Sequence, residues 1–240
     1  MLKVTAGLAD NVANFASLGI GKLVIKGDID GSAGGAEAGL VKINGGIGEV
    51  IVKGSVIGGA DRSGIVSNRQ LGSVKIAGDV RSANPNKPVT ISALGVQGSA
   101  LVLAIKKLTI AGDVENAQIL AGYRTGGAAQ NPDASIGQII VKGNWSASSV
   151  AAGIADSTGD GFGQNDTLIP GDTTPAQFSK IASIVIAGTA TGSTAGGDFF
   201  GITAQEVGTA KIHHTSLAFT PNKDDLDLDP VNGDFRLVEV

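Results

Sequence analysis

The sequence predicts an all-β protein, a single-stranded right-handed parallel β-helix of about six to seven coils. Three observations predict it: a six-residue phrase that recurs along the chain, an alternation of apolar and other residues inside that phrase, and 37 glycines among 240 residues. A unit that returns every roughly 20 to 50 residues is typical of solenoids. Irregular spacing of the repeats and the general right-handedness of parallel crossovers favour the right-handed form.

The phrase reads branched apolar, any residue, branched apolar, any residue, glycine, small polar. Copies occupy residues 23–28, 50–55, 74–79, 108–113, 139–144 and 184–189, with a decayed copy at 210–215. Period-two alternation indicates a strand with one buried face. The residues expected to point inward are Leu23, Ile25, Val50, Val52, Val74, Ile76, Leu108, Ile110, Ile139, Val141, Ile184 and Ile186.

The glycine of each phrase predicts a backbone corner that a side chain would hinder. The polar residue after it is expected to hydrogen-bond nearby backbone in a turn; these residues are Asp28, Ser55, Asp79, Asp113, Asn144 and Thr189. Because Ser, Asn and Thr replace Asp at this position, capping of the corner is a better interpretation than catalysis by stacked carboxylates.

Two further short strands complete each coil. A second inward residue follows each glycine by two positions: Ile29, Val56, Val80, Val114, Trp145 and Ala190. A third apolar stretch then appears in several coils, at 40–43, 89–91, 119–121 and 200–202. Stacking equivalent strands in register would bury the inner face of each coil against its neighbours.

We expect a single domain over residues 1–240, with an N-terminal cap at 1–19, coils at 20–215 and a C-terminal cap and tail at 216–240. Leu8, Val12 and Phe15 have helical spacing, which predicts a short capping helix. Residues 235–240 alternate again and predict a capping strand. Insertions at 81–88, 123–135 and 155–180 are rich in turn-forming residues, and any specific site is expected there first.

The longest insertion carries a calcium-loop hypothesis. Asp156, Thr158 and Asp160 fall at positions 1, 3 and 5 of such a loop, with Asp166 as a further oxygen ligand. Position 12 is Thr167, where an EF-hand needs a bidentate Glu, so a plain Asp/Gly-rich turn is the alternative. No other cofactor is expected.

Outward-facing strand residues raise a second hypothesis. Val24, Ile51, Ile140 and Val185 share one column and would form an assembly flank for identical subunits or a neighbouring domain. The alternative is an ordinary exposed sheet, because β-branched residues suit any strand. His213 and His214 are adjacent, so on a strand they would face opposite sides and could not share a metal.

Composition excludes several classes of protein. Eighteen basic and 22 acidic side chains give a net charge of −4, without the basic footprint of a nucleic-acid partner. The sequence has no apolar run of the roughly 18 residues that membrane insertion needs, and cysteine is absent. The first residues do not read as a signal peptide, so the protein either stays inside the cell or is a piece of a longer exported chain. We expect the second, with an extracellular or cell-surface location.

Segments 47–56 and 136–145 resemble the repeat regions of very large bacterial surface and exported proteins, as do 149–154 with 159–163 and the closing 234–240. The resemblance implies an adhesin-like or structural β-helix without catalysis. It supplies no catalytic residues.

The sequence therefore favours a non-enzymatic structural or adhesive segment of a bacterial surface or extracellular protein. Its expected partners are neighbouring domains of a larger chain, identical subunits or a glycan. One alternative is a carbohydrate-active β-helix similar to polysaccharide lyases and hydrolases, which converging carboxylates beside an Arg or Lys in a groove would support. The other is a self-assembling fibre module.

Overall fold

The computed structural model describes residues 19–33, 35, 37–97, 103–172, 176–220, 223–229, 231 and 233–240. Within these ranges the protein is all-β, with 25 strands and no helix. Accordingly, no helix among the described residues has the length and hydropathy needed to cross a membrane. The predicted capping helix at Leu8–Phe15 lies outside the described residues.

Most strands belong to three sheets in which neighbours run parallel. Sheet A contains β1 (Ile20–Ile25), β4 (Ile47–Val52), β7 (Leu71–Ile76), β10 (Ile105–Ile110), β13 (Ile136–Val141), β18 (Lys180–Ile186), β22 (Ala210–Ile212) and β23 (Thr215–Ser216), and β21 (Glu206–Val207) also pairs with β18. Sheet B contains β2 (Ile29–Asp30), β5 (Val56–Gly58), β8 (Val80–Ser82), β11 (Val114–Glu115), β14 (Trp145–Ser146) and β19 (Ala190–Thr191).

Sheet C contains β3 (Leu40–Ile43), β6 (Ser63–Ser67), β9 (Val89–Ala93), β12 (Ala117–Ala121), β15 (Ser149–Ala152), β20 (Phe200–Ala204), β25 (Phe235–Glu239) and β24 (Asp225–Asp227). A separate hairpin pairs β16 (Ile154–Ala155) with β17 (Thr167–Leu168). Among the named strands of the described ranges, only β16–β17, β22–β23 and β24–β25 pair antiparallel.

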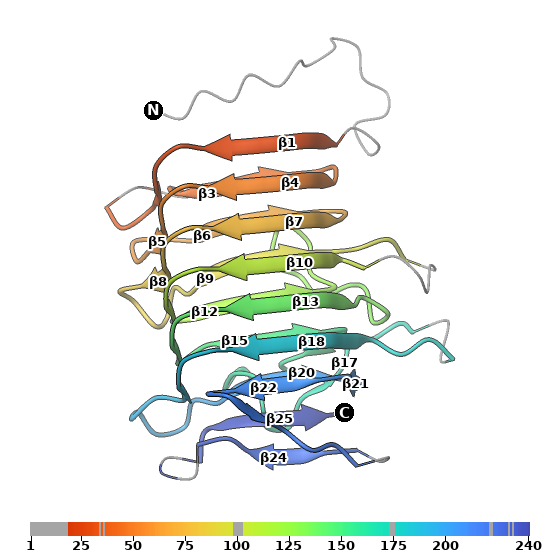
Figure 1. Cartoon of the computed structure of the whole chain (residues 1–240). Helices are drawn as coiled ribbons and strands as arrows, with labels where there is room; N and C mark the ends of the chain where they lie inside the picture. Colours follow the sequence, from red (N-terminus) through yellow and green to blue (C-terminus); the bar gives the residue numbers. More distant parts are fainter. Residues whose placement is uncertain are drawn as a thin grey trace.

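The order of strands within the sheets reveals the repeat. From β1 to β15 each sheet takes every third strand, so the chain visits sheets A, B and C in turn. We call each such set of three strands a rung. The rungs stack along one axis, from β1 at one end to β24 at the other (Figure 1). At that far end β25 pairs parallel with β20 over the segment where a capping strand is predicted, and β24 lies beyond it.

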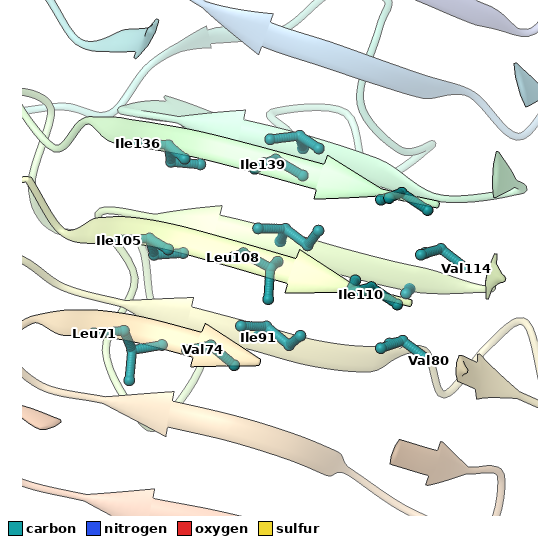
Figure 2. Close-up of a cluster of buried hydrophobic side chains, with 14 of the residues drawn as sticks. Leu71, Val74, Val80, Ile91, Ile105, Leu108, Ile110, Val114, Ile136 and Ile139 are labelled. Carbon is teal, nitrogen blue, oxygen red and sulfur yellow. The ribbon is translucent and has the colours of Figure 1, made fainter. Parts of the chain in front are cut away.

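The main core lies between the sheets as one apolar cluster, to which all three sheets contribute side chains. All twelve predicted inward residues of the phrase are buried in it, which confirms the alternation. Figure 2 shows members of this cluster from all three sheets, among them Leu108 of sheet A, Ile91 of sheet C and Val114 of sheet B. Trp145 is fully buried, in register with the smaller Ala190 of the next rung, and its Nε1–H donates to the Ser148 carbonyl at 2.9 Å.

The polar corner residues form a hydrogen-bonded series, which we call the corner ladder. Asp28 Oδ1 accepts the backbone N–H of Ser55 at 2.7 Å, and Ser55 Oγ accepts that of Asp79 at 3.0 Å. The same bond joins Asp79 to Asp113, Asp113 to Asn144 and Asn144 to Thr189, at 3.0, 2.7 and 3.1 Å. The predicted hydrogen bonding is confirmed for five of the six residues, but each of these side chains caps the next rung rather than its own turn, and Thr189, the last, instead donates back to Asn144 Oδ1 at 3.1 Å.

The corner ladder also explains the glycine of the phrase. A Cβ added at Gly54, Gly78, Gly112, Gly143 or Gly188 would lie closer than 3.0 Å to the capping oxygen of the preceding rung. Gly27 stands before the first ladder residue and has no described atom within 4 Å of such a Cβ. Space for the neighbouring side chain, rather than an unusual backbone angle, therefore requires glycine at these corners.

His213 and His214 correct one expectation. They form the turn between β22 and β23 rather than part of a strand, and both have positive φ, at 45° and 68°. Their ring centroids lie 5.6 Å apart and both residues are exposed. β22, the last strand of the repeat in sheet A, ends at Ile212. The chain then reverses, and β23 pairs antiparallel with β22.

Candidate functional site

The outer face of sheet C is the part of the scaffold that the insertions cover. Its strands are buried on both faces over much of their length. Leu120 and Ala151 point away from the main core and join a second apolar cluster with Tyr123, Ile154 and Phe162. The insertions at 123–135 and 155–180 supply Tyr123, Phe162 and Ile169 of this cluster, so these loops pack onto the sheet rather than extending into solvent.

Tyr123 joins the two insertions. Its hydroxyl donates to the Ile154 carbonyl at 2.8 Å, and its ring is buried. Burial, with the nearby Asp166 and Asp156 carboxylates, raises the pKa of Tyr123, so the phenol stays protonated. The β16–β17 hairpin is thereby held against the sheet at a defined position.

Beside this cluster lies a trench over sheet C, lined by both apolar and polar residues. It consists of two cavities, of about 530 and 430 Å³, that share Asn86, Pro88 and Gln118 as lining residues. Thr90 and Gln118, in register on β9 and β12, form its floor. Neither floor side chain makes a hydrogen bond within the described part of the chain, and both are half-buried. We call this feature the trench.

Charged groups are unevenly distributed along the trench. Arg62 and Lys87 line one end, where Lys87 also pairs with Asp61 at 3.7 Å. Asp156 lines the same cavity, and Asp160 lines the second one. Asp198 also lines the second cavity. Acidic groups therefore outnumber basic ones in the part of the trench away from Arg62.

The predicted calcium loop holds its shape through its own hydrogen bonds. Asp156 Oδ1 accepts the N–H groups of Thr158 and Gly159 at 3.2 and 2.6 Å, and its Oδ2 accepts that of Gly161 at 3.0 Å. Thr158 Oγ1 donates to Asp160. These contacts make the segment a tight Asx-type turn in which the oxygens of Asp156 are already occupied.

Asp166 lies in the same loop but in a different environment. Its Oδ2 accepts the Gly163 N–H at 2.6 Å, while its Oδ1 is inaccessible to solvent and has no hydrogen-bond partner in the described ranges. Burial, with a smaller contribution from the Asp156 and Asp160 carboxylates, raises the pKa of Asp166 to about 7, against the opposing effect of the hydrogen bond from the Gly163 N–H.

The four proposed calcium ligands share one loop, and calcium binding there stays a prediction. Among the described residues, no group of three His, Cys, Asp or Glu side chains is arranged to hold a metal ion. Thr167, at the position of the missing Glu, belongs to β17 and is exposed.

The four residues of the proposed assembly flank do occupy one column of sheet A. Val24 pairs with Ile51, and Ile140 pairs with Val185. Lys75 and Thr109 stand between the two pairs in the same register, so the apolar column is interrupted. Val24 is 45% exposed and the other three are half-buried.

The trench itself was missed at the sequence level, although a signal for it exists. The third strand of several rungs lacks polar alternation: Ser149–Ala152 reads SVAA and is buried throughout. A short strand without alternation indicates burial on both faces, and hence a covering layer over sheet C.

Comparisons with known proteins add no information about this site. No protein-family model, no curated protein sequence and no solved structure matches this chain.

Proposed function

We propose that the three sheets close into a single-stranded right-handed parallel β-helix, and that the chain is a non-enzymatic structural or adhesive segment of a bacterial surface or extracellular protein. The observation that carries the proposal is the gathering of the insertions over one face of a continuously paired scaffold. Repeat scaffolds of this kind usually present long recognition surfaces.

The chemistry of the trench favours binding over catalysis. A glycosidase needs two carboxyl groups that reach the substrate, one as an acid and one as a base or nucleophile. Asp166, whose raised pKa suits an acid, does not line the trench, and its Oδ1 is inaccessible. Asp156 lines the trench, but three backbone N–H groups occupy its oxygens.

A carbohydrate-active enzyme is the second candidate, because one observation favours it. Arg62, Lys87 and Asp156 line a single cavity, and Asp160 lines the adjoining one. Basic and acidic side chains facing one trench are what cleavage of a charged polysaccharide would need.

Two assays on the intact chain separate these functions. Incubation with a panel of plant and bacterial polysaccharides, followed by measurement of reducing ends, should show no product above a heat-denatured control. Microspheres coated with the chain should be retained on polysaccharide-coated surfaces more than albumin-coated microspheres. Reducing ends that accumulate with time would replace the proposal by the enzymatic one, and equal retention of both kinds of microsphere would remove the adhesive role.

A further inference from the structure

The trench has the shape of a site for an extended chain. Its two cavities follow the stacking axis, from Arg62 just before β6 to Phe200 on β20. In sheet C the order β6, β9, β12, β15, β20 contains four intervals between neighbouring strands. Neighbouring strands lie about 4.8 Å apart, so the trench is about 15 to 20 Å long. A linear ligand of several units fits this length better than a compact one.

The floor of the trench determines how such a ligand can be recognised. The backbone of β12 pairs with β9 on one side and β15 on the other, so no peptide strand can add to the sheet there. Recognition at the floor must therefore come from side chains, and the floor offers the Thr90 hydroxyl and the Gln118 amide. Thr90, Gln118 and Asn86 each present donors and acceptors toward the same space.

Neighbouring hydroxyl and amide groups of this kind match the paired hydroxyls of a pyranose. Thr90 and Gln118 repeat at the spacing of one strand, which is close to the length of one sugar unit in an extended chain. The buried aromatic rings of Tyr123 and Phe162 form part of the wall and supply an apolar surface beside the polar floor.

The charged side chains of the lining restrict the class of ligand further. Lys87 is paired with Asp61, which leaves Arg62 as the cation of the lining that makes no ion pair within the described residues. Asp156, Asp160 and Asp198 are acidic. A polyanion would meet net repulsion over most of the trench, whereas a neutral chain would not.

We infer that the trench binds a neutral oligosaccharide, laid along the stacking axis over Thr90 and Gln118. The inference rests on the proposed adhesive function and names the class of ligand that it would take.

Isothermal titration of the intact chain tests it with cellohexaose, mannohexaose, chitohexaose and hexagalacturonate as probes. At least one neutral hexasaccharide should bind at millimolar or lower concentration, and hexagalacturonate should bind more weakly. Gln118→Ala should weaken binding about tenfold, since it removes the amide's paired hydrogen bonds. Gln138→Ala is the matched control: Gln138 is also half-buried at a strand position outside the core, but on sheet A, and it should leave binding unchanged.

Four results would overturn the inference: no binding of any neutral hexasaccharide, tighter binding of hexagalacturonate, equal effects of the two glutamine variants, or retention of peptides from a casein digest without retention of sugar. Unchanged melting temperatures of both variants confirm that folding is intact. Reducing-end release would refute only the non-enzymatic function, whereas absent binding would refute only the trench, so the two proposals fail separately.

Discussion

Replacing Gly112 by alanine should destabilise the protein, although the change is small and the site is at the surface. An added Cβ would lie 2.8 Å from the carbonyl carbon of Gly78 and 2.9 Å from its oxygen, and closer still to Asp79 Oδ1. The carboxylate must therefore move away, and the Asp113 N–H loses its 3.0 Å acceptor.

The expected cost follows from these contacts. Loss of one partly exposed hydrogen bond costs about 1 kcal/mol, and the backbone shift that relieves the Gly78 contacts costs about 1 to 2 kcal/mol more. Alanine has less conformational freedom than glycine in the unfolded chain, which stabilises the folded state by roughly 0.5 kcal/mol. The free energy of unfolding should fall by about 2 kcal/mol, and the melting temperature by about 4 to 8 °C.

Gly27→Ala is the matched control, because Gly27 has the same place in the phrase and no described atom near its added Cβ. It should be neutral or slightly stabilising. Both variants can be measured by urea denaturation, followed through the fluorescence of Trp145, the single tryptophan. Equal stabilities of the two variants would refute the steric explanation of the repeat glycine. The Asp79→Ala/Gly112→Ala double variant should lose less than the sum of the single changes, since both remove the same hydrogen bond.

Three further predictions concern the core, the acidic loop and the outer face of sheet A. Trp145→Ala should lower the free energy of unfolding by about 3 to 5 kcal/mol, measured by calorimetry, because the side chain is fully buried; a loss below about 1 kcal/mol would show that the core collapses around the gap. Asp166 has a pKa of about 7 in the folded chain against 3.8 as the free side chain, so the folded state retains a proton that the unfolded state has released between these values. Stability should fall as pH rises through that window, by about 2 kcal/mol once partial solvent exposure is allowed for, and Asp166→Asn should flatten this slope; an unchanged slope would assign the pH dependence to other groups. Ile51→Lys and Ile140→Lys should leave the mass from light scattering unchanged, because the apolar column is interrupted; a lower mass in the variants would establish the assembly flank.

The phrase predicted the repeated strands of sheet A, and the residue two positions after its glycine predicted those of sheet B, whereas no copy of the phrase predicted β21 or β23. Alternation of large branched residues is a local property, and it identifies the buried face wherever one face meets solvent, as at Val50 and Val52. The role of the corner residues was predictable only in part. Hydrogen bonding follows from the residue types, but the partner of Asp28 is Ser55, and only the stacking of rungs brings them together.

Strands without alternation, such as Ser149–Ala152, indicate that sheet C is covered, but no local pattern shows which segments cover it. The 155–180 insertion resembles a solvated turn in sequence, yet it packs on sheet C through Phe162 and through Tyr123 of another loop. Asp166 shows the same limit. Its residue type and neighbours suggest a ligand, while its inaccessible Oδ1 and raised pKa result from the folded environment.

The corner ladder has a consequence for how such a molecule can lengthen. Each side-chain oxygen accepts a backbone N–H of the unit that follows, and each unit from Ser55 to Asn144 offers an accepting oxygen at the same position. Duplication of the DNA encoding one unit would therefore insert a rung whose corner oxygen accepts the N–H of the following rung and whose own N–H donates to the oxygen of the preceding rung. No compensating substitution would be needed for these two hydrogen bonds. Growth and shortening by whole units are then the least disruptive genetic changes open to the chain, and the glycine that makes room for each neighbour would be copied along with it.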